Sequence, residues 1–308
     1  MQSRFKETIV TPILILVVFA LIGAANFLPE EALGIDSNPY LAVVIIQLLT
    51  YAVPALFYSR IRGKELTPGL RLRFFKPSQI LFLVQSALFL LSGTVLISML
   101  MYKLSPVAFE ASAVTEYAAF AMNRRFLDGV YLVVAFAVLP AITEEFLFRG
   151  IVLGEYGKDG LFIAAVVSAA MFGMSHFSLV RFPVYFFSGL VLALVTYATR
   201  SVLAAMLIHA LNNAFVLLCE QYIMNAVDKQ NISLALLVII LGALALLSCM
   251  LMCFEANNIY RKYAHSNIES DHAAPKKDGA LTRFVRVFFS PTFLLLTLVF
   301  IVVCVAAK

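Results

Sequence analysis

Long apolar runs are the feature that most constrains this chain, because a helix of roughly 20 apolar residues crosses a lipid bilayer. We place such runs at 9–28, 40–58, 79–101, 129–156, 161–177, 183–199, 201–223, 232–254 and 284–306. The sixth run is short, since Arg181 and Arg200 bound it, so eight or nine spans are both consistent with the sequence. The predicted fold class is all-α: a polytopic transmembrane helical bundle of about 8–9 spans.

Composition agrees with a membrane protein and disfavours a soluble one. Hydrophobic residues make up 62% of the chain and charged residues 13%, against about 45–50% and about 25% in soluble domains. The net charge of +5 lies mainly beside the apolar runs, which indicates contact with membrane surfaces and no nucleic acid partner. No cysteine spacing fits a zinc site or a disulfide framework, so we interpret the cysteines as small buried apolar residues. They are Cys219, Cys249, Cys253 and Cys304.

The charges of the connecting segments predict how the chain crosses the membrane. Segments 59–78 and 255–283 are basic, whereas Glu30, Glu31 and Asp36 lie between the first two runs. With nine spans both basic segments fall on the side of Arg4 and Lys6, so we expect a multi-pass protein of the cell membrane with a cytoplasmic N-terminus. An alternative for the first run is a cleavable signal peptide.

We divide the chain into three regions. Residues 1–124 hold N-terminal spans and a predicted interfacial amphipathic helix at 105–127. Residues 125–224 form a core of spans that carries the motifs described below. Residues 225–308 hold the last spans and a polar cytoplasmic loop at 255–283, whose 264–280 part we expect to be flexible.

Two adjacent glutamates, Glu144 and Glu145, lie inside the fourth apolar run, where each carboxylate costs about 2.5–3.5 kcal/mol on insertion scales. Glu145 and Arg149 are one helical turn apart, in the order that favours an ion pair. Glu144 points about 100° away and lacks that partner. We expect Glu145 and Arg149 to support a site and Glu144 to be available to accept a proton. Alternatively, all three charges contact lipid headgroups at a span end.

A second motif, Phe172-x-x-x-His176, lies in the fifth run. The stretch 155–160 predicts a tight hairpin before it. Counted from this turn, Glu144 and His176 lie roughly 22 and 26 Å along their helices, so the two antiparallel spans bring them to nearly the same depth. An isolated histidine in a span would instead bond a carbonyl across a helix interface.

The third motif, His209-x-x-x-Asn213, places both side chains on one face of the seventh run, while Asn212 turns aside. His209 lies only roughly 12 Å past the preceding turn, so its depth disagrees with the other two motifs. A tilt, or a kink at Pro140 or Pro183, would reconcile them. The alternative role for this motif is a hydrogen bond between helices.

Together the motifs supply an acid, two imidazoles and an amide, which are groups that activate a water and stabilise an oxyanion. A metal site formed by Glu144, His176 and His209 remains an alternative. The sequence contains no HExxH, phosphate-binding loop or GxSxG motif. His265 and His272 lie in the polar loop, and we assign them no role.

The ordered set EExxxR, FxxxH and HxxxN, in separate spans over roughly residues 125–220, resembles the CAAX protease and bacteriocin-processing family. This family is also called the abortive-infection or type II CAAX prenyl endopeptidase family. Its members are glutamate-dependent intramembrane endopeptidases with an all-helical core. The resemblance implies that Glu144 and His176 activate the hydrolytic water, that His209 and Asn213 hold the oxyanion, and that Glu145, Arg149 and Phe172 support the site.

The sequence therefore favours an intramembrane endopeptidase that acts on a peptide or a membrane-anchored protein in the lipid bilayer, without a cofactor or a metal. Two other classes stay open. One is a non-catalytic scaffold or immunity factor on the same fold. The other is a proton-coupled transporter, because acids and histidines in spans also form proton relays. The absence of paired repeats argues against a transporter.

Overall fold

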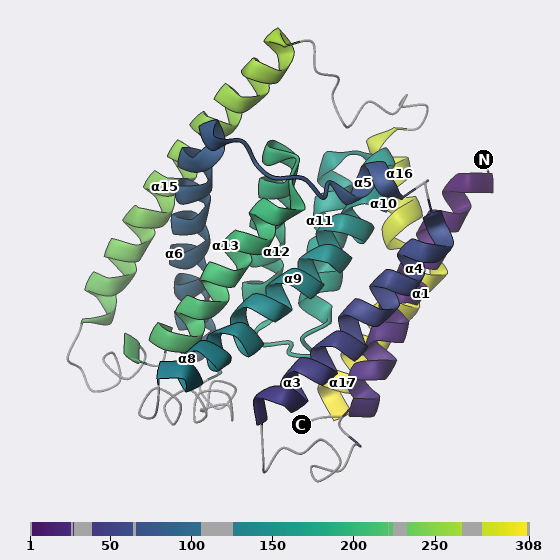
Figure 1. Ribbon diagram of the computed structural model, residues 1–308, viewed down its shortest axis with the longest axis horizontal. Helices are drawn as coiled ribbons and strands as arrows, with labels where there is room; N and C mark the ends of the chain where they lie inside the picture. Colours follow the sequence, from purple (N-terminus) through teal and green to yellow (C-terminus); the bar gives the residue numbers. More distant parts are fainter. Residues whose placement is uncertain are drawn as a thin grey trace.

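The structure is a computed structural model, and it describes residues 2–25, 27, 39–63, 66–105, 126–220, 222–223, 233–266 and 279–306. Every regular element in these ranges is a helix (Figure 1). The prediction of an all-α fold is confirmed. Residues 106–125, which include most of the predicted interfacial helix, lie outside the described ranges.

Six helices of the described ranges are long and apolar enough to cross a bilayer: Tyr40–Arg62, Pro77–Leu104, Leu127–Asp159, Phe182–Thr199, Val202–Cys219 and Leu234–His265. A seventh is formed if α16 (Ala280–Phe288) and α17 (Pro291–Ala306), which meet at a bend of 52°, count as one span. Two shorter apolar helices, Ile9–Ala25 within α1 (Gln2–Ala25) and α11 (Leu161–Met174), fall at the first and fifth predicted spans. The prediction of 8–9 spans is compatible with these helices.

The span Leu127–Asp159 alternates between α-helical turns and wider π-helical turns. Its segments are α8 (Phe126–Val133), η5 (Val134–Val138), α9 (Leu139–Glu145), η6 (Phe146–Val152) and α10 (Leu153–Tyr156). Pro140 is the second residue of α9 and has no N–H to donate, which interrupts the regular helical bonding where η5 ends. The Glu144-Glu145-x-x-x-Arg149 motif crosses the junction of α9 and η6, and π-helical turns are frequent at functional sites.

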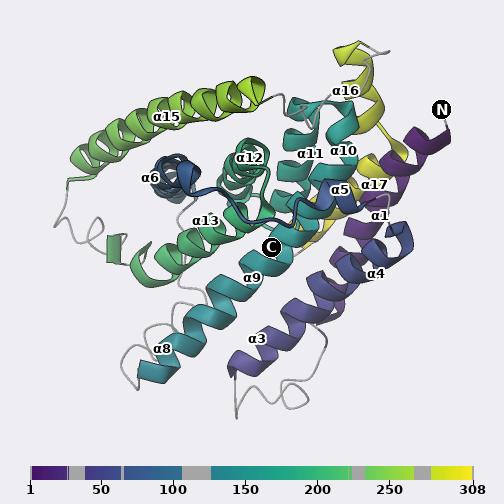
Figure 2. The ribbon, with the colours of Figure 1, turned by 45° about the horizontal axis from the view of Figure 1, so that its top comes forward.

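The hairpin predicted at 155–160 is confirmed. The chain leaves α10, makes one tight turn at Gly157–Asp159 and enters α11. Gly160 takes φ +108°, a backbone conformation that residues with a side chain rarely adopt, and its N–H bonds the carbonyl of Gly157 at 3.2 Å. The turn sets α10 and α11 side by side (Figures 1 and 2).

A second sharp turn joins α12 (Phe182–Thr199) to α13 (Val202–Phe215). Arg200 ends α12 in the left-handed conformation, and the hydroxyl of Ser201 then accepts a bond from the N–H of Ala204 at 3.2 Å. This N-cap starts α13, which carries the third motif. Among the spans of the described ranges, α12 is the most enclosed by other helices.

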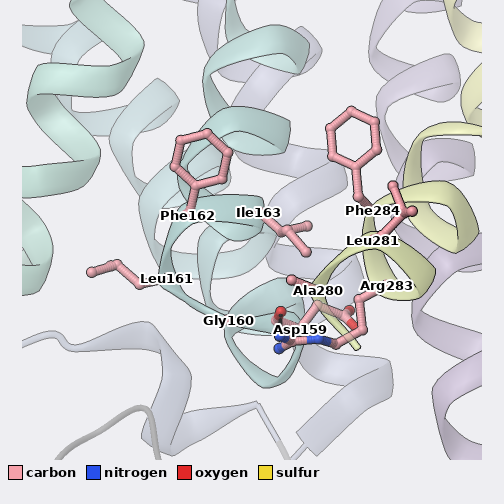
Figure 3. Close-up of a pocket in the computed structure, with 9 residues that line it drawn as sticks. All are labelled: Asp159, Gly160, Leu161, Phe162, Ile163, Ala280, Leu281, Arg283 and Phe284. Atoms are coloured by element: carbon pink, nitrogen blue, oxygen red, sulfur yellow. Dashed lines mark hydrogen bonds between the residues drawn. The ribbon is translucent and has the colours of Figure 1, made fainter. Parts of the chain in front are cut away.

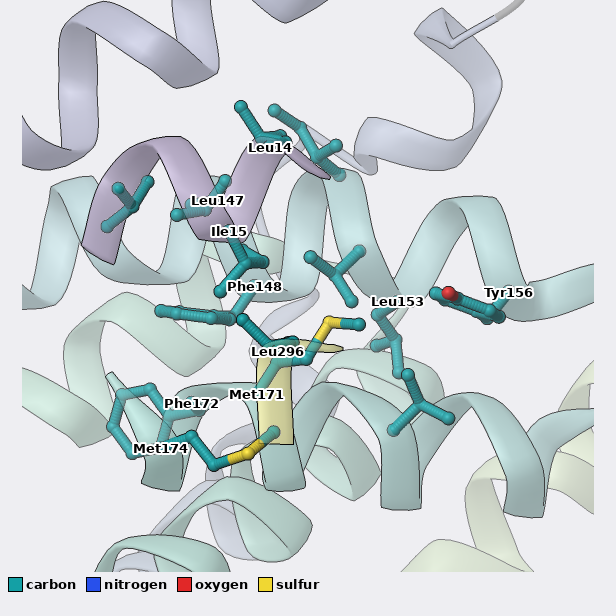
Figure 4. Close-up of a cluster of buried hydrophobic side chains, with 14 of the residues drawn as sticks. Leu14, Ile15, Leu147, Phe148, Leu153, Tyr156, Met171, Phe172, Met174 and Leu296 are labelled. Atoms are coloured by element: carbon teal, nitrogen blue, oxygen red, sulfur yellow. The ribbon is translucent and has the colours of Figure 1, made fainter. Parts of the chain in front are cut away.

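The main apolar core lies where α1, η6, α10, α11 and α17 meet (Figure 4). Leu14 and Ile15 of α1 reach into it, as do Phe148 of η6 and Phe172 of α11. Because Phe172 belongs both to this core and to the second motif, tight core packing holds one side of the motif region in place.

At the edge of the bundle, α15 (Leu234–His265) packs along α6 (Ile80–Leu104), as Figures 1 and 2 show. The polar loop predicted for 255–283 is helical at both ends, because α15 continues to His265 and α16 begins at Ala280. Lys262 and His265 occupy the last turn of α15, where cations stabilise a helix, so the helix extends past its apolar part.

Candidate active site

A buried ion-pair network forms the centre of the candidate site. The guanidinium of Arg149 donates from Nη1 to Oε1 of Glu145 at 2.6 Å, and both side chains are fully buried. Nδ1 of His209 lies 2.8 Å from the same oxygen. The ion pair predicted from the spacing of Glu145 and Arg149 is therefore confirmed, and it gains a histidine from α13.

Arg149 is held by three different elements. Besides the bond to Glu145, its Nη2 donates to the carbonyl of Gly189 on α12 at 3.1 Å. A side chain on Gly189 would place a Cβ 2.7 Å from the Cα of Ala169, so glycine is what lets α12 approach α11 this closely. The guanidinium also lies 4.6 Å from the centre of the Phe172 ring, a cation–π distance.

The ring of Phe172 connects the two histidine motifs. Its centre lies 4.9 Å from the His176 ring and 5.6 Å from the His209 ring, both in edge-on geometry. Since Phe172 also packs edge-on against Phe148, the two imidazoles are placed around one rigid aromatic side chain. Despite the depth mismatch expected from residue counting, α13 packs along α9 and brings His209 to Glu145 (Figure 1).

His176 follows the end of α11 and is only half-buried. Its Nδ1 lies 2.9 Å from the carbonyl oxygen of Phe172, and its ring stacks on Tyr185 with 3.7 Å between the centres and 18° between the planes. A stacked ring with a bonded Nδ1 has a defined orientation, so the direction of Nε2 is fixed.

The two imidazoles differ in the acceptor that each Nδ1 meets. Carbonyl and carboxylate oxygens only accept hydrogen bonds, so Nδ1 carries the proton in both rings. His176 donates to a neutral carbonyl, and this leaves the lone pair of a neutral ring on Nε2. His209 donates to the carboxylate of Glu145, so its Nε2 is a donor only when the ring also carries a second proton. Among the described residues, neither Nε2 makes a hydrogen bond.

Glu144 is buried beside the network without belonging to it. One oxygen, Oε1, accepts a bond from Nε2 of Gln47 at 3.0 Å, and the same amide nitrogen lies 3.0 Å from the hydroxyl of Thr143. The carboxylate interacts electrostatically with His209, Glu145 and Arg149. Within the described ranges its second oxygen has no hydrogen bond, and no hydrogen bond joins Glu144 to His176.

The two asparagines of the third motif differ in their surroundings. Asn212 is buried, and its Oδ1 accepts a bond from the hydroxyl of Thr94 on α6 at 3.2 Å. Asn213 lies one turn beyond His209, is half-buried, and its side chain has no hydrogen bond with the described residues. The structure thus brings His209 into the ion-pair network and leaves the Asn213 amide outside it.

Two neighbours of the motifs were not predicted from the sequence. Gln47 ends α3 (Pro39–Gln47), and Tyr185 lies in the first turn of α12. The sequence did indicate a role for Gln47, because an amide side chain inside an apolar run requires a hydrogen-bond partner. Tyr185 had none, since tyrosine is common in spans without a polar role.

The positions of the acidic and histidine side chains bear on the alternative of a metal site. Among the described residues, no three His, Cys, Asp or Glu side chains are grouped so that they would hold a metal ion. Glu144, His176 and His209 therefore do not form such a group as they are placed here.

Comparisons with known proteins bear on the same segment. Residues 126–215 match the family model described as "Type II CAAX prenyl endopeptidase Rce1-like". The resemblance to CAAX prenyl endopeptidases is confirmed. This matched segment holds all three motifs and ends at the last residue of α13.

Two curated proteins are each similar to this chain over a stretch of about 100 residues. The "Putative membrane peptidase YdiL" of Bacillus subtilis (strain 168) is 25% identical over 109 residues, which are 35% of this chain and 45% of the relative. The "Membrane-embedded CAAX protease MroQ" of Staphylococcus aureus (strain USA300) is 28% identical over 91 residues, which are 27% of this chain and 37% of the relative. The chain thus covers less than half the length of each relative. No solved structure matches the chain.

The apolar helices and these similarities support a multi-pass membrane protein that is similar to CAAX proteases over residues 126–215. The family model begins at residue 126, so α1, α3 and α4 (Val53–Arg62) lie before it. The Gln47 contact to Glu144 therefore comes from a part of the chain that the family model does not include.

Proposed function

We propose that this protein is an intramembrane peptidase in which Glu144 activates the water that hydrolyses a peptide bond. The observation that carries this proposal is the contrast between two adjacent buried carboxylates. Glu145 forms an ion pair with Arg149 and a bond with His209, whereas the one hydrogen bond of Glu144 among the described residues comes from the uncharged amide of Gln47. A buried carboxylate without its own cation gains stability when it takes up a proton, which is the property a general base needs.

In the proposed reaction, water donates one proton to Glu144 while its oxygen attacks the scissile carbonyl carbon. His176 assists through the lone pair on Nε2, whose direction is set by Tyr185 and by the Phe172 carbonyl. When the C–N bond breaks, Glu144 passes this proton to the leaving nitrogen, directly or through Nε2 of His176. The products are a carboxyl group and an amine, and Glu144 returns to its carboxylate form.

The negative charge of the tetrahedral intermediate falls on the former carbonyl oxygen. We assign its stabilisation to Nε2–H of His209 and to the side-chain amide of Asn213. Glu145 supports this role, because its carboxylate accepts the bond from Nδ1 of His209 and so fixes the direction of the ring. Arg149 in turn holds Glu145 in place from a fully buried position.

The relatives support the same reaction class, since one is named a putative membrane peptidase and the other a membrane-embedded CAAX protease. We extend that class to this chain and propose a membrane-anchored protein or a peptide precursor as the substrate. Hydrolysis takes place within or near the bilayer, because the carboxylate lies inside a membrane span.

The decisive experiment is quantitative proteomics of membranes that contain the wild-type protein or the Glu144→Gln variant. Gln keeps the size of the side chain and removes the base, so uncleaved precursor should accumulate and the cleavage rate should fall by about 10²–10⁴. Glu155→Gln is the matched control, since Glu155 is a buried glutamate of the same span outside the site. Normal processing by Glu144→Gln would exclude the proposed role.

A further inference from the structure

A second candidate binding site lies at the end of the bundle where the α10–α11 turn meets α16. A cavity of about 490 Å³ opens there, lined by residues 159–163 and by four residues of α16 (Figure 3). Its volume falls within the roughly 300–1,000 Å³ that is typical of small-molecule sites. None of the three motifs contributes to it.

One side of the cavity is polar and built from buried groups. Arg283 is buried, and its Nη1 donates to the carbonyl oxygen of Asp159 at 2.7 Å. Arg286 does not line the cavity itself, but its Nη2 donates to Oδ1 of the lining residue Asp159 at 2.5 Å. A side chain on Gly160 would place its Cβ 3.1 Å from Nη1 of Arg283, so the turn has little room for anything but glycine beside this guanidinium.

The opposite side is apolar and exposed. Figure 3 shows the rings of Phe162 and Phe284 on either side of the opening, away from Asp159 and Arg283. Phe162 is 73% exposed and Leu281 is 76% exposed. The cavity therefore separates a polar floor from apolar walls, which suits a molecule with a charged group at one end and a hydrocarbon chain at the other.

Helix α16 has the features of a helix that lies at the membrane surface. It turns 52° away from α17, and its apolar residues Leu281, Phe284 and Val285 are exposed. Its basic residues Arg283 and Arg286 point to the α10–α11 turn. An amphipathic basic helix at a bend next to a span is the usual arrangement at the headgroup level of a bilayer.

The charge around the cavity is positive. Helix α16 carries two basic side chains, Arg283 and Arg286, and no acidic side chain. Asp159 adds one negative charge to the floor of the cavity, and the exposed Lys158 beside it adds one positive charge. The surplus of cations favours an anionic ligand over a neutral or zwitterionic one.

We propose that this cavity binds an anionic phospholipid, with the phosphate at Arg283 and Arg286 and an acyl chain between Phe162 and Phe284. The lipid contacts both α16 and the α10–α11 turn, so its binding stabilises the hairpin that carries Phe172 on one arm and Glu144 on the other. This site is independent of the proposed hydrolysis, because it uses none of the residues assigned to that reaction.

The test uses the full-length protein purified in a neutral detergent, with three probes: phosphatidylglycerol, phosphatidylcholine and inorganic phosphate. Native mass spectrometry counts bound lipid, and thermal unfolding reports stabilisation. We expect one retained phosphatidylglycerol and a higher melting temperature, with neither effect from phosphatidylcholine or inorganic phosphate. Equal effects of the two lipids would overturn the anionic site, and an equal effect of inorganic phosphate would show that no lipid chain is involved.

Substitutions distinguish lipid binding at this cavity from a general attraction of anionic lipid to surface cations. Arg286→Gln should weaken phosphatidylglycerol binding about fivefold, while Arg261→Gln, which removes an exposed cation of α15, should leave it unchanged. Phe162→Ala tests the apolar wall without removing a buried group, and Phe57→Ala on the exposed surface of α4 is its control. An equal loss in Arg286→Gln and Arg261→Gln, or unchanged binding in Phe162→Ala, would contradict the proposal.

Discussion

One membrane span carries two buried acidic clusters that are built differently. At Glu155, on α10, both carboxylate oxygens are bonded: Oε1 accepts from Nε of Arg62 at 2.9 Å and from the hydroxyl of Tyr58 at 3.1 Å, and Oε2 accepts from Nη2 of Arg62 at 3.0 Å. At Glu144, on α9, one oxygen accepts a single bond from an uncharged amide. Glu145 beside it has one oxygen shared by Arg149 and His209, and its other, buried oxygen has no hydrogen bond with the part of the chain that the structure describes.

This difference separates a structural contact from a site that is able to react. The Glu155 cluster is a bidentate ion pair that fastens α4 to α10, and its carboxylate has no oxygen left for a substrate. Among the described residues, the Glu144 cluster keeps buried carboxylate oxygens and ring nitrogens without hydrogen bonds. Such groups lower the stability of a protein, and they are found mainly where function requires them. Substitutions in the two clusters should therefore affect different properties.

The largest expected effect on stability comes from Arg149→Ala. This change leaves Glu145 buried without its cation, and breaking a buried pair from one side typically costs about 3–5 kcal/mol. Arg62→Ala at the other cluster should cost less, because the Arg62 side chain is 20% exposed and Tyr58 still bonds Glu155. The free energy of unfolding of each variant in mixed micelles measures the difference.

The double variant Glu145→Gln with Arg149→Met serves as the control for this interpretation. Removing both charges together should restore part of the stability, because position 145 no longer holds a buried carboxylate without its cation. A melting temperature of Arg149→Ala equal to that of the wild type would contradict the structural role of Arg149, whatever its effect on cleavage.

The next effect concerns rate and compares two neighbouring amides. Asn213→Ala should slow cleavage by about 10²–10³, the usual loss for one oxyanion donor. Asn212→Ala removes the acceptor of Thr94 instead, so it should lower stability by about 1 kcal/mol and keep most of the activity. The precursor identified with Glu144→Gln is the substrate for both rate measurements. If Asn212→Ala slowed cleavage more than Asn213→Ala, the oxyanion role proposed for Asn213 would be wrong.

Local spacing was enough to predict much of this arrangement. The i, i+4 spacing of Glu145 and Arg149 predicted their ion pair. The stretch with glycines at 157 and 160 predicted the hairpin that returns α11 beside α10. The apolar runs predicted the all-helical fold, because their length and hydropathy are direct consequences of crossing a bilayer.

Contacts that depend on helix tilt were beyond the sequence. Counting residues from the turns gave His209 a depth that disagrees with the other two motifs, whereas the packing of α13 against α9 places its Nδ1 2.8 Å from Glu145. The central position of Phe172 between Arg149, His176 and His209 was likewise hidden, since an apolar ring in an apolar run carries no polar signal. The helical ends of the 255–283 segment were missed because polar residues also continue a helix beyond the bilayer.

The smallest effect tests the residue that distinguishes the Glu144 cluster most directly. Gln47→Leu removes the single bond to Glu144, which is worth about 0.5–1.5 kcal/mol, so cleavage should slow roughly two- to tenfold. Gln79→Leu is the matched control, because Gln79 is a buried glutamine that donates to the hydroxyl of Tyr263 at 2.9 Å, away from the motifs. It should lower the melting temperature and leave the rate per folded molecule unchanged. If both variants slow cleavage equally, Gln47 acts only through stability, and the Glu144 carboxylate is oriented by other contacts.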